Sequence, residues 1–256
     1  MSLIKKSFSE YADTYDLYAA AQKKGALILK DEIIKSDLTC FTNKNILELG
    51  AGTGLLSEHL ARIFKDSNLF FSDISCEMLS ICRNKTDKIK NKNNYYFACD
   101  AGEFIKKKYF SLILSSFTLQ WINDYLKAFE NFYNSLESGG VLYLAFQGPE
   151  SFPEWKESAL ELGLKYTANK MPDPEKLEKI FNKKFKKTEI FRKDIKLNYK
   201  SALDFFLSLK YIGASHKTGN TNLSRKDFLK LIRHWDKKTD NNIEITYCVW
   251  FFKGEK

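Results

Sequence analysis

Three glycines at alternate positions are the residues whose type and spacing most clearly suggest chemistry. Residues 45–49 form a short apolar run that contains one acid, Glu48, and Gly50, Gly52 and Gly54 follow it. Glycine has no Cβ, so it accepts unusual backbone angles and lets a ligand touch the main chain. Apolar residues then recur at helical spacing, which predicts a helix whose N-terminus faces the turn. An ordinary strand-to-helix turn rarely needs three glycines, so the pattern favours a ligand-binding loop.

The spacing of these glycines excludes two phosphate-binding loops. The dinucleotide fingerprint requires Gly-x-Gly-x-x-Gly, but its third glycine would fall on Leu55 counted from Gly50, or on Ser57 counted from Gly52. The P-loop requires Gly-Lys-Ser/Thr, which does not follow the turn. What is left is Glu-x-Gly-x-Gly-x-Gly at the end of a strand.

Acidic residues follow the next two predicted strands. Asp73 ends an apolar run at residues 68–72, and Asp100 comes shortly after another at 95–98. An acid at the end of the second strand can accept hydrogen bonds from both ribose hydroxyls of a nucleoside. The alternative for Asp73 is a helix cap. Asp100 can accept a hydrogen bond from the exocyclic amine of adenine, with the Ala101 amide facing a ring nitrogen.

Alternating strands and helices would place these residues on one edge of a sheet. Further strands are predicted at 109–115 and 141–146, and helices at about 54–65, from 75 onward and at about 124–136. This alternation predicts a parallel sheet that binds its ligand at the carboxyl ends of the strands. Gly50, Asp73, Asp100 and Ser116 all fall at such ends, and their convergence is stronger than any single motif.

The segments on either side of this core are predicted to cover it. Residues 8–35 have a helical pattern with a stripe of tyrosines, which is either core packing or an aromatic lid over the ligand loop. After residue 149, helices are predicted at 152–168, 200–213 and 224–236, with an extra strand at 185–199. We predict one domain over residues 1–256, made of an N-terminal helical lid at 1–40, a cofactor-binding core at 45–148, a substrate-side elaboration at 149–240 and a closing strand at 243–252.

Composition bounds the class of protein. The chain has 256 residues, of which 44% are hydrophobic and 15% aromatic, as in a folded globular protein. No run approaches the ~18 apolar residues that span a membrane, and the first ten residues show no signal peptide. Five cysteines and three histidines show no zinc spacing, so we predict no metal site. The cysteines are expected to be small, reduced apolar residues in a cytoplasmic protein.

The net charge of +9 is compatible with several partners. It could reflect nucleic acid, an acidic protein partner or a lysine-rich composition, and it bears on association but not on fold.

The first 146 residues resemble the core of class I S-adenosylmethionine-dependent methyltransferases, because the ligand loop, Asp73, Asp100 and the fourth-strand exit occur together. The flanks resemble, more narrowly, the malonyl-[acyl-carrier protein] O-methyltransferases of biotin synthesis. The stretches that carry this second resemblance are Phe8-x3-Ala12-x2-Tyr15-Asp16-x5-Gln22, 117–121, 208–216 and Ile245-Thr246-Tyr247. The resemblance implies a seven-stranded, mostly parallel Rossmann-like α/β sheet with helices on both faces, an N-terminal helical lid and a helical insertion before the last strand.

The resemblance also implies roles for individual residues. S-adenosyl-L-methionine would be bound by Tyr15, Gln22, Glu48, Gly50, Ala51, Gly52, Asp73, Ile74, Met78, Asp100, Ala101 and Ser116. Substrate would be positioned by Tyr15, Gln120, Trp121, Lys210 and His216. Lys210 could equally be a solvated helix lysine.

The implied reaction moves a methyl group to the free carboxylate of a malonyl thioester, giving a methyl ester for biotin (pimeloyl) synthesis and S-adenosyl-L-homocysteine. A carboxylate of pKa ~4 is already ionised, so no general base is required. The implied partner is an acyl-carrier protein, and its acidic surface could be steered by the basic residues at 183–193, unless these form a solvated strand. Membrane is not an expected partner.

Three other functions are compatible with the sequence. A methyltransferase acting on another small carboxylate or a quinone-type metabolite would share everything up to residue 146. A nucleic-acid methyltransferase would use the positive charge, but Ser-Ser-Phe-Thr stands after the fourth strand where Asn/Asp-Pro-Pro-Tyr/Phe would be expected. A non-catalytic nucleoside-binding regulator would keep the pocket without turnover.

Overall fold

The computed structural model describes residues 3–214, 223–240 and 242–256. Strands form one seven-stranded sheet in the order β3-β2-β1-β4-β5-β7-β6. The strands from β1 to β5 pair in parallel, whereas β7 is antiparallel to both β5 and β6. The bounds are β1 Asn45–Leu49, β2 Asn68–Asp73, β3 Asn93–Ala98, β4 Phe110–Ser116, β5 Leu136–Gln147, β6 Lys187–Tyr199 and β7 Ile243–Glu255. The predicted mostly parallel sheet is confirmed.

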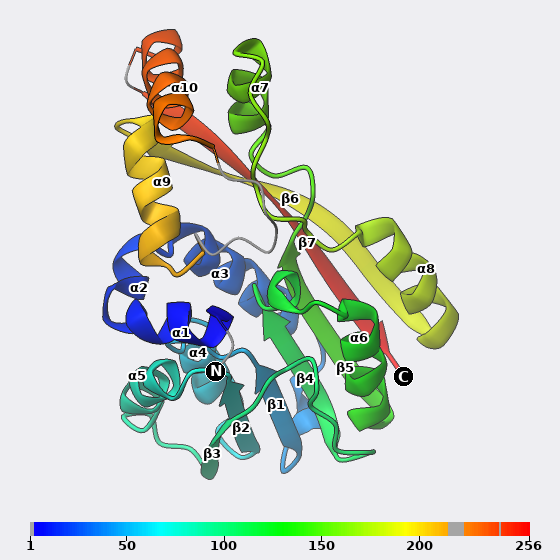
Figure 1. Ribbon diagram of the computed structural model, residues 1–256. Helices are drawn as coiled ribbons and strands as arrows, with labels where there is room; N and C mark the ends of the chain where they lie inside the picture. Colours follow the sequence, from blue (N-terminus) through cyan, green and yellow to red (C-terminus); the bar gives the residue numbers. More distant parts are fainter. Residues whose placement is uncertain (1–2, 215–222, 241) are drawn as a thin grey trace.

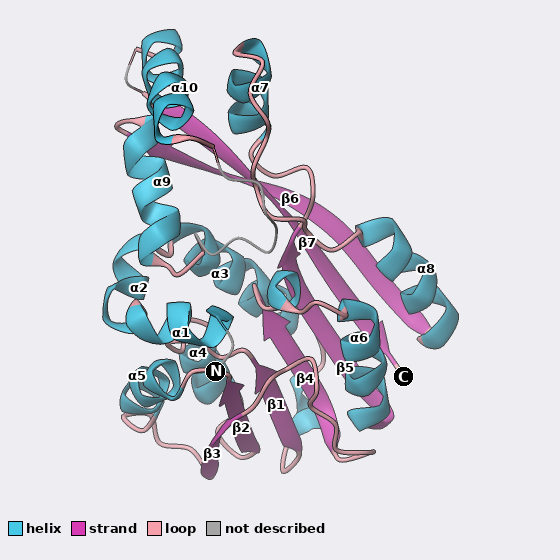
Figure 2. Cartoon of the chain, viewed as in Figure 1, coloured by secondary structure: helices cyan, strands magenta, loops and turns pink. Residues whose placement is uncertain are grey.

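Helices cover both faces of this sheet (Figure 2). Their bounds are α1 Leu3–Glu10, α2 Ala12–Tyr18, α3 Ala20–Ile34, α4 Ser57–Ile63, α5 Cys76–Thr86, α6 Tyr125–Ser135, α7 Pro153–Glu161, α8 Pro174–Lys184, α9 Ala202–Tyr211 and α10 Arg225–Lys238, with 3₁₀ turns η1 Leu38–Phe41 and η2 Leu119–Trp121. Side chains of β1 alternate between the two faces, since Ile46 packs in one hydrophobic cluster and Leu47 and Leu49 in the other. Helices α3 and α4 contribute to the first cluster, and α6 and α8 to the second.

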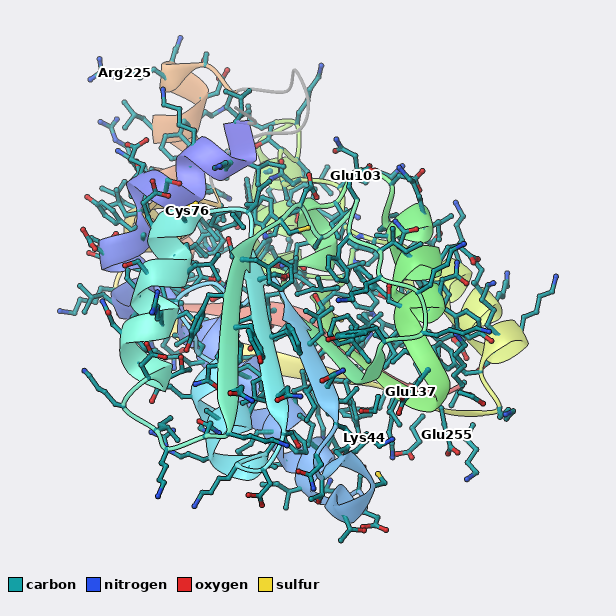
Figure 3. The ribbon with its side chains drawn as sticks, turned by 90° about the horizontal axis from the view of Figure 1, so that it is seen from below. Lys44, Cys76, Glu103, Glu137, Arg225 and Glu255 are labelled. Carbon is teal, nitrogen blue, oxygen red and sulfur yellow. The ribbon has the colours of Figure 1, made fainter. Side chains whose placement is uncertain are left out.

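The carboxyl ends of the parallel strands lie beneath the N-terminal helices. Figure 1 shows α1 and α2 over the ends of β1 and β2. The long strands β6 and β7 run past the end of β5 and carry α7, α9 and α10 above the same edge (Figure 1). In Figure 3, Lys44, Glu137 and Glu255 lie together at the opposite edge, where Lys44 and Glu137 form an ion pair of 3.1 Å. The loops that follow the parallel strands therefore lie at the sheet edge that α1, α2, α7, α9 and α10 cover.

The continuous helical pattern predicted for residues 8–35 is wrong in detail. The chain breaks at Tyr11 and at Ala19, which separate α1, α2 and α3. The reason is tertiary: the Phe8 ring packs on Trp121, with centroids 5.4 Å apart, while the Tyr18 ring stacks on Tyr211 at 4.7 Å. One straight helix would not satisfy both contacts.

Two more boundaries differ from the sequence prediction. The helix predicted over residues 152–168 ends at Glu161, because Gly163 takes φ 65° and the Leu164 N–H donates to the Ala159 carbonyl at 2.9 Å. The predicted closing strand at 243–252 is β7, which extends to Glu255 and runs between β5 and β6. Strand β6 is itself part of the predicted helical insertion.

The cysteines are only partly the buried apolar residues that composition suggests. All five are free thiols; Cys82 and Cys248 are buried, whereas Cys40 and Cys76 are exposed. No helix within the described ranges is long and apolar enough to cross a membrane.

Candidate functional site

The glycine turn is held in a backbone conformation that favours glycine. Gly50, Gly52 and Gly54 have φ values of 72°, 56° and 90°. Between them, the Ala51 N–H donates to the Ser72 carbonyl at 2.8 Å, which ties the turn to the end of β2. A Cβ on Gly52 would meet nothing within 4 Å, so its main chain faces open space.

Asp73 joins this turn to the start of α5. Its carboxylate accepts hydrogen bonds from the backbone N–H groups of Gly52 and Ser75, both at 2.9 Å. The cap of α5 is Ser75, whose hydroxyl accepts from the Met78 N–H at 3.2 Å, and Asp73 bonds the N–H of this cap residue. Burial raises the pKa of Asp73, and its backbone hydrogen bonds oppose that rise.

A cavity of about 270 Å³ lies between the turn, the ends of β2 to β4 and the N-terminal helices. We call it the first cavity. Nine of the predicted cofactor residues line it: Tyr15, Gly50, Gly52, Asp73, Ile74, Met78, Asp100, Ala101 and Ser116. A small cavity of about 30 Å³ adjoins it and is lined by Tyr15, Gln22, Glu48, Ala51 and Ser116 among others. Every cofactor-binding residue predicted from the sequence therefore lines one of these two cavities.

Glu48 is a buried acid that forms no ion pair within the part of the chain that the structure describes. It is 2% exposed and accepts a hydrogen bond from the Ser57 hydroxyl at 2.6 Å. Burial raises its pKa to about 8, the Ser57 hydrogen bond lowers it and the negative charge of Asp73 raises it further. Glu48 is thus mostly protonated at neutral pH in the structure.

The raised pKa of Glu48 predicts that stability depends on pH. Between an ordinary carboxyl pKa of 4.5 and the folded value of about 8, the folded protein binds more protons than the unfolded chain. The free energy of unfolding should therefore fall as pH rises through this window, by about 1 kcal/mol per pH unit. Urea unfolding of the cofactor-free protein measures it, and Glu48→Gln should flatten the slope. An equal slope in the variant would contradict this assignment.

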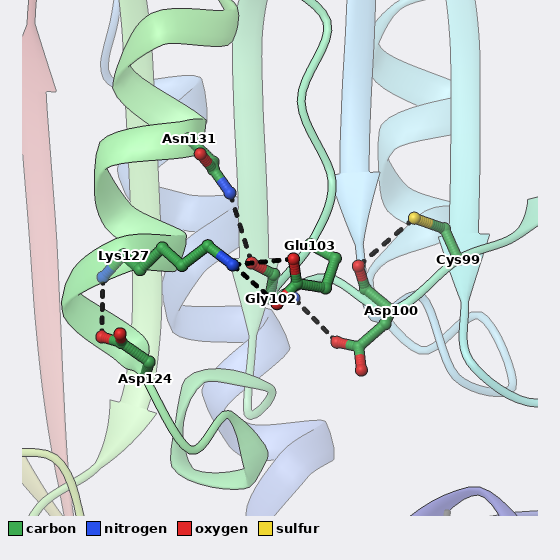
Figure 4. A network of polar contacts seen from close by, with 7 residues as sticks. All are labelled: Cys99, Asp100, Gly102, Glu103, Asp124, Lys127 and Asn131. Atoms are coloured by element: carbon green, nitrogen blue, oxygen red, sulfur yellow. Dashed lines mark hydrogen bonds and ion pairs between the residues drawn. The ribbon is translucent and has the colours of Figure 1, made fainter. Parts of the chain in front are cut away.

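On the side of the first cavity that lies away from the glycine turn, polar contacts join the loop after β3 to the start of α6 (Figure 4). The Asp100 carboxylate accepts from the Gly102 N–H at 2.8 Å. Lys127 donates to Glu103 at 2.8 Å, and the Lys127 N–H donates to the Asp124 carboxylate at 3.0 Å. Lys127 therefore contacts two residues that line the cavity, Glu103 through its ammonium group and Asp124 through its backbone N–H.

The N-terminal helices cover the first cavity and are tied to the core. The Thr53 hydroxyl donates to Asp16 of α2 at 2.5 Å, and Lys85 of α5 pairs with the same carboxylate. The Ser9 hydroxyl of α1 donates to Glu77 at 2.5 Å. Burial and then the charges of Asp73 and Asp16 raise the pKa of Tyr15, so its hydroxyl keeps its proton over the physiological pH range.

The chain leaves β4 in a strained conformation. Phe117 has φ 54°, which is rare for an aromatic residue. Its N–H donates to the Ala145 carbonyl at 2.7 Å. Its ring packs so closely on Gly25 that a Cβ added there would lie 2.4 Å from a ring carbon. Gly25 thus lets α3 approach, and Phe117 lines the first cavity. Sequence reasoning did not single out either residue, although unusual backbone angles often mark functional sites.

A second cavity, of about 390 Å³, lies beside the first between α7, α9 and α10. Trp121 lines both cavities. The predicted substrate residues Gln120 and Lys210 line the second cavity, as does Gln22. His216 lies outside the described residues. No group of three or more His, Cys, Asp or Glu side chains is placed to hold a metal ion in the part of the chain that the structure describes.

Sequence reasoning missed several residues of the second cavity. They include Gln147, Trp155, Phe206 and Phe228. Gln147 ends β5 at the same sheet edge as Ser116, a signal that was available. The other three come from helices whose placement depends on how β6 and β7 extend beyond the sheet.

Comparison with known proteins decides the family. A model of the methyltransferase domain matches residues 7–184. The malonyl-[acyl-carrier protein] O-methyltransferase 2 of Ilyobacter polytropus is 32% identical over 98% of this chain and 97% of its own length. The chain belongs to the malonyl-[acyl-carrier protein] O-methyltransferase family. Another member, from Priestia megaterium, is 28% identical over 97% of this chain and 96% of its own length.

The fold of this methyltransferase is also that of solved structures. The YcgJ protein of Bacillus subtilis has a TM-score of 0.59, covering 86% of this chain and 95% of that one at 12% identity. At that identity the likeness shows the fold alone. The predicted family and fold are confirmed, and the roles of single residues stay predictions.

Proposed function

We propose that this protein binds its cofactor in the first cavity and a malonyl thioester in the second, and methylates the free carboxylate of that thioester. The protein is an S-adenosylmethionine-dependent O-methyltransferase, and its methyl ester product enters pimeloyl synthesis for biotin. The observation that supports the arrangement is Trp121, which lines both cavities and so marks where donor and acceptor would meet.

The residues of the first cavity fit S-adenosyl-L-methionine. The bare main chain at Gly52 allows close approach, and the buried carboxylate of Asp73 suits ribose hydroxyls. The proposed contacts are Glu48, Gly50, Ala51 and Gly52 with the methionyl end, Asp73 with the ribose, Ile74 and Met78 with adenine, Asp100 and Ala101 with its edge, and Tyr15, Gln22 and Ser116 around the methionyl group.

The reaction requires the protein mainly to position the two reactants. When bound, the cofactor supplies a methyl group on a sulfonium and leaves as S-adenosyl-L-homocysteine. An acceptor carboxylate of pKa ~4 is ionised without a base, and Tyr15 stays a hydrogen-bond donor because its pKa is raised. Residues 1–40 act in this proposal as a lid, because α1 and α2 cover the cavity and exclude water from the carboxylate.

The carrier is proposed to be an acyl-carrier protein that docks on α10. This helix holds six Lys or Arg residues against two Asp, and Phe228 on it lines the second cavity. Exposed Arg225, Lys226 and Lys230 would attract an acidic carrier.

The basic stretch at 183–193 is less suited to docking. None of its residues lines either cavity. Lys184 pairs with Glu130 at 2.8 Å, and Arg192 pairs with Asp194 at 3.4 Å. We therefore favour α10.

Charge reversal tests the docking surface. Arg225→Glu, Lys226→Glu and Lys230→Glu together should raise KM for malonyl-carrier protein at least about ten-fold and leave KM for malonyl-pantetheine unchanged, because only the carrier bears the acidic surface. Lys183→Glu, Lys186→Glu and Lys193→Glu form the matched control, which should change neither. Equal KM values in the two triple variants would contradict docking on α10.

A further inference from the structure

Buried polar atoms without a partner are concentrated in the second cavity. Within the described part of the chain, five buried side-chain atoms have no hydrogen-bond partner. Two of them belong to Asn91 and Asn94, in and just before β3. The other three all line the second cavity: Gln120 Oε1, Gln147 Nε2 and Trp155 Nε1. Leaving a buried donor or acceptor unsatisfied is costly, so each of these groups needs a partner from outside the chain, either water or a ligand.

Gln147 and Trp155 present N–H donors in fixed positions. Each residue is 6% exposed. The Trp155 ring is packed edge-on against Phe206, with centroids 4.9 Å apart, and against Tyr166 at 5.2 Å, so its N–H direction is set by packing. Gln147 is the last residue of β5, where it pairs in register with Val249 of β7. Packing therefore sets the direction of the Trp155 N–H, and the strand places Gln147, whose amide can turn its nitrogen to the cavity.

The walls around these donors suit a neutral acceptor. They are largely aromatic and aliphatic, with Phe152, Phe206 and Phe228 among them, and Lys210 is the one charged side chain among the described lining residues. Two neutral N–H groups in apolar surroundings match a carbonyl oxygen.

Gln147 lies at the same sheet edge as Ser116 of the first cavity. Ser116 of the first cavity ends β4 and pairs in register with Ala145 of β5. Gln147 lies two residues after Ala145 on β5. A carboxylate at Trp121, where the cavities meet, would leave the thioester carbonyl of a three-carbon acyl group on the side of Gln147. The amide of Gln120, next to Trp121, can turn either its oxygen or its nitrogen to that carboxylate.

We infer that Gln147 Nε2–H and Trp155 Nε1–H bind the thioester carbonyl of the acyl acceptor and so select an acyl group whose free carboxylate reaches the methyl donor. This inference rests on the proposed function, because it assigns the second cavity to a malonyl thioester. It adds the two residues that recognise the thioester.

The proposed contact is tested by removing the thioester carbonyl from the substrate and, separately, each N–H donor from the protein. The probes are malonyl-pantetheine and its 2-carboxyethyl thioether, in which a methylene replaces the carbonyl. Wild type should prefer the thioester by roughly 100-fold in kcat/KM, about ten-fold for each hydrogen bond. Trp155→Phe should lose about ten-fold on the thioester and little on the thioether, because an aromatic ring is kept at this position and the indole N–H is removed. Gln147→Leu should show the same pattern, with a loss of about ten-fold on the thioester and little change on the thioether.

Controls separate the possible failures. Trp250→Phe, which removes an indole N–H bonded to Glu150 at 3.3 Å on the surface, should leave both rates unchanged. Cofactor affinity by calorimetry and the melting temperature should stay near wild type in Trp155→Phe and Gln147→Leu. If either folded variant keeps the full preference of wild type for the thioester, or loses activity equally on both probes, the carbonyl contact is refuted. If wild type methylates neither probe, the proposed function itself fails.

Discussion

Replacing Asp73 by alanine is expected to weaken binding of S-adenosyl-L-methionine by about 100-fold or more. The carboxylate holds two backbone N–H groups, of Gly52 and Ser75, and lines the first cavity at the end of β2. The variant would lose its hydrogen bonds to the ribose, which are strong because the acceptor is charged, and would also loosen the glycine turn. Calorimetric titration of the cofactor measures the loss.

The milder Asp73→Asn variant should weaken binding less, because one oxygen still accepts a hydrogen bond. Asp66→Asn, an exposed change just before β2, is the matched control and should keep wild-type affinity. A dissociation constant for Asp73→Ala within about two-fold of wild type would remove Asp73 from the cofactor site.

Replacing Gly50 by alanine is the second change with a large expected effect. A Cβ at this position would lie 1.9 Å from Thr118 Oγ1 and 2.8 Å from Thr118 Cβ, and the residue has φ 72°. Thr118 is short and branched at Cβ, so it cannot move aside without moving the exit from β4. We expect cofactor affinity to fall by more than about 100-fold and the free energy of unfolding to fall by about 2 kcal/mol.

Gly139→Ala is the control that separates the cost of a left-handed backbone from the steric clash with Thr118. Gly139 has φ 75°, but a Cβ there would meet nothing within 4 Å. This variant should lose only about 1 kcal/mol of stability, the cost of a left-handed conformation, and keep its cofactor affinity. If Gly50→Ala bound cofactor as well as Gly139→Ala does, close packing of the turn against Thr118 would not matter for binding.

The cofactor side of the site could be predicted from sequence because it depends on local signals. The alternation of β1, the glycines after it and the acids after β2 and β3 all report on residues within a few positions of one another. Parallel pairing then brings strand ends to one edge, so Asp73 and Asp100 line the same cavity as Gly50 although far apart in sequence.

The acceptor side could be predicted only in part, because it depends on tertiary placement. Trp155 has no sequence neighbour that marks it, and it reaches the second cavity only because α7 is carried beyond β5 by the extension of β7 (Figure 1). The breaks at Tyr11 and Ala19 have the same origin, since they let one aromatic stripe pack against both Trp121 and Tyr211. Periodicity shows that such residues are helical and does not show which partner each will contact.

The most direct test of the proposed function is the mass of the acyl group after reaction. The purified protein would be incubated with S-adenosyl-L-methionine and malonyl-acyl-carrier protein, and the carrier-bound product examined by mass spectrometry. The account predicts the gain of one methyl group, and no gain with acetyl-acyl-carrier protein, which has no free carboxylate. An unchanged malonyl group, or a methyl group also added to the acetyl carrier, would contradict it.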